Sequence, residues 1–326
     1  MIYPWQENQW SLISSLIQAK TLPHAILLQG SAGTGKHEFA HHLAKSVLCR
    51  QPTSSHSACG QCEACRIVDA QTHPDLINIK PLPPEKSKSK TPVLSIKVEG
   101  IRALCKKLTR TSQFEGFRVA IIEDADFMVI SASNGLLKTL EEPGDDVLII
   151  LVSSKPARLP VTVRSRCRKI RFELPDTEVA LSWLNTQSVI DADLALRMAH
   201  GAPLIAIALD EERLAQRKLL TKAFTASLNN EISITYAQDL SLLPKERALD
   251  WLFDWVCDLI KIKSCNTTVA LVNSDCESSL LRIAKSIEDK AIFDFYDLLF
   301  ESRKAVGIAL NPQLFWENLL ISWDNL

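Results

Sequence analysis

The stretch Gly30-Ser-Ala-Gly33-Thr-Gly35-Lys36-His37 follows the short apolar run Ala25–Gln29 and precedes a helical pattern over about residues 37–48. It fits G-x-x-x-x-G-K, the phosphate-binding loop (P-loop), in the strand–loop–helix setting that this motif requires. The glycines let backbone N–H groups wrap the phosphates, the helix N-terminus adds favourable charge, and the lysine reaches the terminal phosphates. The sequence therefore predicts a P-loop fold.

Whether this loop uses a nucleotide is a separate question. The position after the lysine normally offers a Ser or Thr hydroxyl to Mg²⁺. Here it is His37, and an imidazole is a poor ligand for a hard ion that prefers oxygen. A working nucleotide site and a P-loop that is kept as a scaffold both remain open.

Two acidic residues, Glu123 and Asp124, end the apolar run that begins at Val119. Carboxylates at this place in P-loop ATPases hold Mg²⁺ through water and orient the attacking water. The usual order is Asp then Glu, so each side chain here differs from the usual one by a methylene, a displacement that catalysis tolerates badly. Acidic residues also occur at strand ends without a function, and this motif alone decides nothing.

Apolar runs and helical patterns alternate through the first half of the chain. After Ala25–Gln29, the runs are Leu76–Lys80, Val119–Glu123 and Val147–Ser153. Such alternation predicts a mostly parallel sheet with helices on both faces. It stops near Pro175, and the remainder has a helical pattern. Four tryptophans of that part are expected in its core: Trp251, Trp255, Trp316 and Trp323.

The composition excludes some classes of protein. The 326 residues include 37 basic and 38 acidic ones, for a net charge of −1. A protein that coats nucleic acid on its own usually carries excess positive charge, which is missing here. The apolar runs are far shorter than the ~20 residues that span a bilayer, and the N-terminus lacks the pattern of a secretory signal. We expect a cytoplasmic protein without a membrane partner.

Four of the nine cysteines lie in the pattern Cys49-x9-Cys59-x2-Cys62-x2-Cys65. Four thiolates that close a tetrahedral site are typical of structural Zn²⁺. An iron–sulfur cluster usually has a further cysteine at the x3 position, which is absent, and a redox pair would leave two cysteines unexplained. His56 and His73 are alternative ligands.

Ser165-Arg166-Cys167 lies beyond the last apolar run, after Leu159-Pro160. An arginine at a domain edge can stabilise negative charge on a phosphate in a neighbouring subunit, which is the role of an arginine finger. Taken alone, an arginine in such a basic stretch is more often a solvated surface residue. Only its context favours the functional role.

Together these motifs resemble those of the bacterial clamp-loader subunits, the AAA+ proteins of the DNA polymerase III holoenzyme. The resemblance also includes Leu22-Pro-His-Ala25, Thr72-His-Pro-Asp75, Asn134–Pro143 and Asn311-Pro-Gln-Leu314. It implies an α/β P-loop AAA+ domain over residues 1–172, with a zinc module inserted at 49–65. A small helical lid domain over 173–212 and an all-α collar domain for oligomerisation over 213–326 would follow.

Within this family, three departures favour the delta-prime type over the ATP-hydrolysing gamma/tau type. They are His37, the altered acidic pair, and Leu204 where the ATPases carry a nucleotide-sensing arginine. The delta-prime type implies a non-hydrolysing subunit that helps gamma/tau and delta subunits to load the sliding clamp onto primed DNA. In it, Arg166 would act in trans, with Ser165 and Cys167 of its motif, on a neighbouring ATP site.

The same departures put ATP and Mg²⁺ in doubt as cofactors of this subunit, although Lys36 and the glycines of the loop are intact. Two alternatives stay open. One is an active gamma/tau-like ATPase that uses Lys36, Glu123 and Asp124. The other is a zinc-dependent nucleic-acid-binding module with a relic P-loop.

Overall fold

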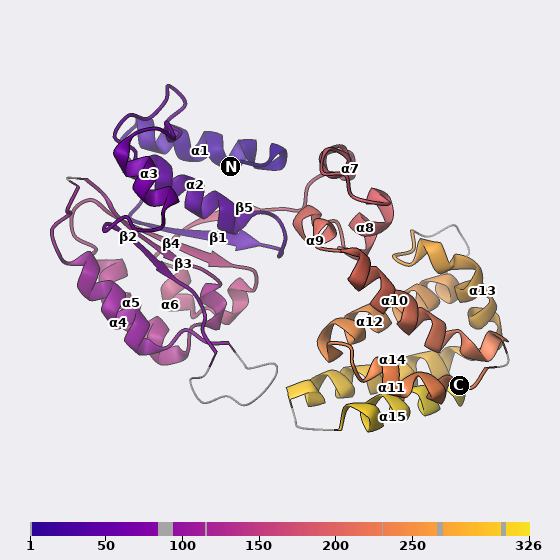
Figure 1. Ribbon diagram of the computed structural model, residues 1–326. Helices are drawn as coiled ribbons and strands as arrows, with labels where there is room; N and C mark the ends of the chain where they lie inside the picture. Colours follow the sequence, from indigo (N-terminus) through magenta and orange to yellow (C-terminus); the bar gives the residue numbers. More distant parts are fainter. Residues whose placement is uncertain (1, 84–93, 115, 230, 266–269, 308–310) are drawn as a thin grey trace. The chain divides into compact units, whose positions relative to one another are not determined.

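The computed structural model describes residues 2–83, 94–114, 116–229, 231–265, 270–307 and 311–326. The chain divides into two compact units, Met1–Val179 and Ala180–Leu326. Each unit is described by itself below (Figure 1).

The first unit is built on a five-stranded parallel sheet with the strand order β2-β3-β4-β1-β5. The strands are β1 (Ala25–Gly30), β2 (Leu76–Ile79), β3 (Arg118–Ile122), β4 (Val147–Ser153) and β5 (Arg168–Phe172). The expected parallel sheet is confirmed, and β1 and β4 pair in the register Ala25 to Ile149. The edge strand β5 was missing from the sequence prediction because it alternates charged and apolar residues and buries only Ile170 and Phe172.

Helices cover both faces of this sheet. They are α1 (Glu7–Gln18), α2 (Lys36–Leu48), α3 (Glu63–Asp69), α4 (Val98–Leu108), α5 (Ile130–Glu141) and α6 (Val161–Arg164). Alternate strand residues point to opposite faces, so Ile26 and Leu28 pack with α1 and α2, whereas Ala25 and Leu27 pack with α4, α5 and α6. This three-layer arrangement holds the carboxyl ends of the strands at one edge of the sheet.

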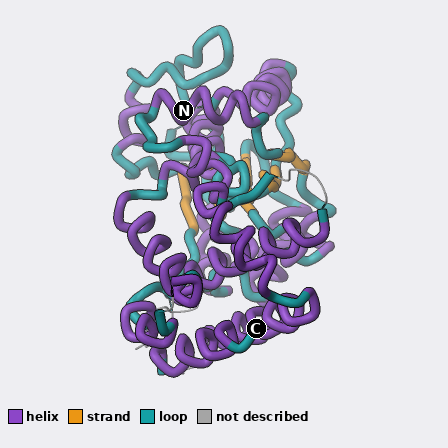
Figure 2. The backbone as a smooth tube through the Cα atoms, turned by 90° about the vertical axis from the view of Figure 1, so that its right-hand side faces the viewer, coloured by secondary structure: helices purple, strands orange, loops and turns teal. Residues whose placement is uncertain are grey.

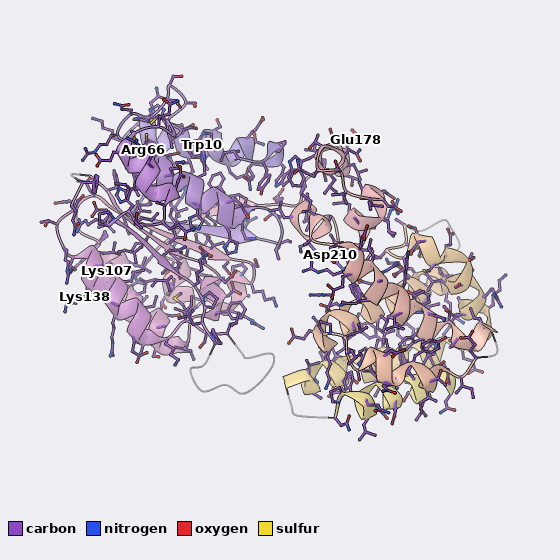
Figure 3. All side chains as sticks on the ribbon, in the orientation of Figure 1. Trp10, Arg66, Lys107, Lys138, Glu178 and Asp210 are labelled. Atoms are coloured by element: carbon purple, nitrogen blue, oxygen red, sulfur yellow. The ribbon has the colours of Figure 1, made fainter. Side chains whose placement is uncertain are left out.

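Helices α4 and α5 lie side by side on their face of the sheet. Each presents apolar residues to the strands, such as Leu104 from α4 and Leu136 from α5. The charged residues Lys107 and Lys138 are exposed and lie on the sides of these helices that face away from the sheet (Figure 3). The periodicity of a helix with one buried stripe explains both placements.

The second unit is helical (Figure 2). Its helices are α8 (Ala192–Met198), α9 (Pro203–Ile207), α10 (Glu211–Phe224), α11 (Ala237–Leu240), α12 (Lys245–Ser264), α13 (Glu277–Ser286), α14 (Asp289–Lys304) and α15 (Pro312–Asp324), and α7 (Thr177–Thr186) spans the division between the units. Short 3₁₀ helices cover Pro4–Gln6, Ala125–Phe127, Pro156–Arg158, Ala226–Asn229, Ser233–Tyr236, Ser274–Cys276 and Ala305–Gly307.

Two apolar cores stabilise this helical part. A small one joins α7, α8 and α9 through residues such as Leu184 and Ala206. A larger one joins α10 to α15 and contains the tryptophans of this region, as predicted: Trp251, Trp255, Trp316 and Trp323. Among the described residues, no helix is both long and apolar enough to cross a bilayer.

Candidate functional site

The P-loop and the acidic pair lie at the carboxyl edge of the sheet. The loop connects β1 to α2, and the acidic pair directly follows β3, two strands away from β1 in the sheet. Ligands of open parallel sheets bind at this edge. Gly33 and Gly35 have φ values of +74° and +84°, a backbone region that glycine enters without steric cost. The loop therefore has, at Gly33 and Gly35, the positive φ angles for which a P-loop needs glycine.

Lys36 begins α2 and is buried, with 2% of its surface exposed. Its Nζ donates to the carbonyl oxygen of Ser31 at 2.6 Å and lies 3.4 Å from Thr34 Oγ1. Burial lowers the pKa of this ammonium to about 8, although nearby carboxylates act against the shift. The Lys36 ammonium thus lies inside the P-loop, where its two oxygen neighbours are the Ser31 carbonyl and the Thr34 hydroxyl.

The first residues of the chain hold the loop from outside, a contact that sequence reasoning missed. Trp5 Nε1 donates to the Thr34 carbonyl at 3.0 Å, and the buried Gln6 amide donates to the carbonyls of Thr34 and Gly35, both at 2.9 Å. A Cβ atom on Gly35 would lie 2.5 Å from Gln6 Nε2. The close approach of Gln6 therefore requires glycine at position 35. A local sequence pattern could not predict this contact, because the two residues are 29 positions apart.

His37 lies against the acidic pair. Its Nε2 is 3.2 Å from Asp124 Oδ1, and its Nδ1 is 3.7 Å from Glu123 Oε2. The neighbouring carboxylates of Asp124 and Glu123 raise the pKa of the imidazole to about 9, against the effect of burial. His37 is therefore a cation at neutral pH, held between two carboxylates.

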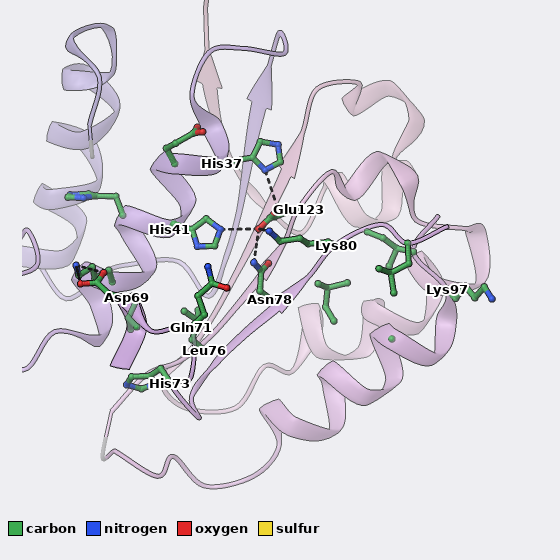
Figure 4. Close-up of a pocket in the computed structure, with 18 of the residues that line it drawn as sticks. His37, His41, Asp69, Gln71, His73, Leu76, Asn78, Lys80, Lys97 and Glu123 are labelled. Atoms are coloured by element: carbon green, nitrogen blue, oxygen red, sulfur yellow. Dashed lines mark hydrogen bonds and ion pairs between the residues drawn. The ribbon is translucent and has the colours of Figure 1, made fainter. Parts of the chain in front are cut away.

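Three further side chains converge on Glu123 (Figure 4). His41 Nε2 lies 2.9 Å and Lys80 Nζ 3.3 Å from its Oε1, and Asn78 Nδ2 donates to the same oxygen at 2.6 Å. Burial would raise the pKa of this carboxyl group, but these hydrogen bonds and the one from His37 outweigh it and hold the pKa well below its usual value. Glu123 is therefore an anion whose Oε1 faces three side chains, while its Oε2 lies 3.7 Å from His37.

Sequence reasoning missed His41, Asn78 and Lys80. One signal was available, because His37 and His41 are four residues apart and so share a face of α2. The other two side chains come from the carboxyl end of β2, beside the end of β3. A cavity of about 1530 Å³ opens next to the cluster, and its lining includes all four of these residues and Glu123.

The residues at this site do not fit Mg²⁺. The hydroxyl that would ligate the ion is replaced by an imidazole, and Mg²⁺ requires oxygen ligands in near-ideal octahedral geometry. The carboxylates of Glu123 and Asp124 are already paired with the chain's own cations. The acidic pair therefore forms an internal ion-pair cluster.

The four predicted cysteines come together at the end of α2. Cys49 caps that helix, Cys59 lies in the following turn, Cys62 caps the start of α3 and Cys65 lies within it. The Sγ atoms of Cys49 and Cys62 are 3.8 Å apart, those of Cys59 and Cys65 are 4.0 Å apart, and all four lie within 4.8 Å of one another. This cluster could hold a metal ion.

The two histidines named as alternative ligands do not join this cluster. Within the described residues, the group of potential metal ligands that comes together here consists of the four cysteines without a histidine. His73 is buried, accepts from the Asp75 amide at 3.2 Å and packs against the Phe114 ring. The motif Thr72-His-Pro-Asp75 has a structural role, because the buried Asp75 carboxylate accepts from the amides of Gln113 and Phe114 and from Ser112 Oγ.

Arg166 follows the short helix α6. Its guanidinium donates to the Thr162 carbonyl at 2.9 Å and forms an ion pair with Glu141 at the end of α5. Its side chain is about one-third exposed. Ser165 donates to the same carbonyl at 3.1 Å, and Cys167 is buried, with Sγ 3.3 Å from the Val163 carbonyl. Both neighbours thus hold the turn, while the partly exposed guanidinium of Arg166 is held by Thr162 and Glu141.

Comparison with known proteins decides the family. Residues 5–176 match the family model described as "DNA polymerase III, delta subunit", and residues 211–325 match the model of its C-terminal part. The "DNA polymerase III subunit delta'" of Pseudomonas aeruginosa is 31% identical over 100% of this chain and 98% of its own length. The chain belongs to the DNA polymerase III delta-prime family.

The chain is also similar to a second delta-prime subunit and to a tau/gamma subunit. The delta-prime subunit of Escherichia coli is 32% identical over 79% of this chain and 76% of its own length. The "DNA polymerase III subunit tau/gamma" of Haemophilus influenzae is 27% identical over 97% of this chain, which spans only 48% of that protein. The identity to the Pseudomonas aeruginosa delta-prime protein, 31%, is higher than the 27% to this tau/gamma subunit.

Proposed function

We propose that this chain is the non-hydrolysing delta-prime subunit of a bacterial clamp loader, which helps to load a sliding clamp onto primed DNA during replication. Membership of the delta-prime family supports the assignment. The observation that carries the absence of hydrolysis is the contact of Glu123 and Asp124 with His37, which places an imidazole where a hydroxyl would ligate Mg²⁺ and pairs it with the carboxylates that would hold the ion and orient a water. The compartment would be the cytoplasm, where the chromosome is replicated.

Its partners in this role would be gamma/tau and delta subunits, and through the complex the clamp and the DNA. The relatives include both a delta-prime and a tau/gamma subunit of DNA polymerase III, which supports an assembly of related chains. We assign residues 1–172 to the AAA+ domain, 173–212 to the lid and 213–326 to the oligomerising collar. The separate apolar core of α7, α8 and α9 supports a distinct lid.

The cysteine cluster would hold a structural Zn²⁺. A tetrahedral zinc ion with Zn–S bonds of about 2.3 Å separates its sulfur ligands by about 3.8 Å. The Cys49–Cys62 and Cys59–Cys65 distances of 3.8 and 4.0 Å match that spacing. When bound, the zinc would tie the end of α2 to α3 and so fix the module at 49–65 on the first unit.

Arg166 would supply positive charge to the ATP site of a neighbouring gamma/tau subunit. Its partial exposure supports this role, and Glu141 would hold the guanidinium in place until the neighbour's phosphate takes it over. An arginine finger contributes about 10³–10⁵ in rate at the site it serves.

The test is the Arg166→Ala variant in a reconstituted loader. We expect assembly to be intact and clamp-stimulated ATP turnover to fall, because the adjacent site loses its finger. Arg168→Ala, which removes an exposed arginine two residues away, is the matched control and should turn over ATP normally. Collapse of the assembly in the Arg166 variant would show that the residue is structural.

A further inference from the structure

We propose that the P-loop of this chain holds nucleotide phosphates without a metal ion, and that the imidazole of His37 takes the position of Mg²⁺. The inference goes beyond the proposed function, because it concerns how this subunit's own loop is occupied and does not depend on Arg166. It rests on three independent features of the loop and its surroundings.

The first feature is the place of the His37 ring. His37 follows Lys36 directly, at the residue that ligates Mg²⁺ in a working P-loop. From there its two ring nitrogens face Glu123 Oε2 at 3.7 Å and Asp124 Oδ1 at 3.2 Å. A cationic ring between the P-loop and the acidic pair has the position and the sign of charge that the metal would have.

The second feature is that the carboxylates need no further cation. Glu123 also receives His41 at 2.9 Å, Lys80 at 3.3 Å and the Asn78 amide at 2.6 Å. The Glu123 side chain is only 10% exposed, whereas those of His41 and Lys80 are 43% and 60% exposed. Entry of Mg²⁺ would disturb these contacts and would place a divalent ion beside the cations His37 and Lys80.

The third feature is that the phosphate cradle is intact. Gln6 holds the carbonyl oxygens of Thr34 and Gly35. Because N–H and C=O point in opposite directions across a planar trans peptide, the amides of Gly35 and Lys36 point away from Gln6. Those amides, the start of α2 and the buried Lys36 ammonium all favour an anion.

The experiment measures ADP binding to the full chain by titration calorimetry, once with MgCl₂ and once with EDTA. We expect the wild type to bind ADP with the same affinity in both, and Lys36→Ala to lose the binding. His37→Thr restores the hydroxyl and removes the cation, so its affinity should become at least about tenfold higher with MgCl₂ than with EDTA. Lys107→Gln, a change at an exposed residue of α4, is the control and should behave as the wild type.

Each outcome decides the proposal. Tighter ADP binding by the wild type with MgCl₂ would show that the metal enters the site and would overturn it. Absence of ADP binding in both conditions, or a His37→Thr variant that gains no dependence on MgCl₂, would overturn it as well. If His37→Thr does not fold, the two wild-type titrations still decide between metal-free and metal-dependent binding. Failure here would leave the loader experiment on Arg166 unaffected, so the two claims are separable.

Discussion

The imidazole Nε2 of His37 lies 3.2 Å from Oδ1 of Asp124, so the first turn of the P-loop helix is joined by an ion pair to the end of β3. In an ATPase the same two positions are bridged by a metal ion and its waters. The chain has the P-loop framework of a nucleotide site, with one of its own side chains against the acidic pair. The contact of His37 with the acidic pair is thus the structural basis on which we propose that this delta-prime chain does not hydrolyse ATP.

The ion pair predicts a pH-dependent stability. The pKa of His37 is raised from its ordinary value of 6.5 to about 9 in the folded protein. A raised pKa stabilises the fold fully below the unfolded value, and this contribution is lost as the pH rises through the folded value. We therefore expect wild type to be more stable than His37→Gln below about pH 6.5, by about 1 kcal/mol given the partial exposure, and the difference to vanish above about pH 9.

Urea unfolding of both proteins at a series of pH values measures this difference. A constant difference across the whole range would show that the His37 ring stabilises the loop by packing and not by its charge.

The cysteine cluster predicts a metal-dependent module. Cys62→Ser removes one of four ligands, so bound zinc should fall from about one equivalent to a small fraction. Residues 49–65 should then become sensitive to proteases, since the metal ties the module to α2. Metal analysis and limited proteolysis check both effects, and Cys265→Ser, at an exposed cysteine, is the control. Full zinc content in the Cys62 variant would remove this residue from the ligand set.

The buried Asp75 carboxylate predicts a large stability effect away from the site. Asp75→Ala would leave the amides of Gln113 and Phe114 and the Ser112 hydroxyl without their acceptor. These donors are only partly buried and water can replace the lost acceptor in part, so the free energy of unfolding should fall by about 1–2 kcal/mol. Asp75→Asn keeps one acceptor oxygen and should lose less. Chemical unfolding measures both, and equal losses would contradict the role of these hydrogen bonds.

The sequence predicted the features that depend on local patterns, and it did not predict those that depend on contacts between distant residues. Strands β1 to β4 were predicted because each is a nearly continuous apolar run, whereas β5 is an edge strand with charged residues at Arg168, Lys169 and Arg171. The cysteine cluster was predicted because its spacing is local. The partners of Glu123 were not, because Asn78 and Lys80 join it through the pairing of β2 with β3, which the sequence does not display.

The absence of catalysis by this chain is tested most directly by steady-state ATP hydrolysis. The purified, zinc-loaded full chain would be assayed with Mg²⁺, beside its Lys36→Ala variant. We predict no turnover above that of the variant, because His37 replaces the hydroxyl that would ligate Mg²⁺ and contacts both carboxylates that would hold the ion and orient the water. Turnover that Lys36→Ala abolishes would contradict this prediction, and would make this chain an ATP-hydrolysing subunit of the loader.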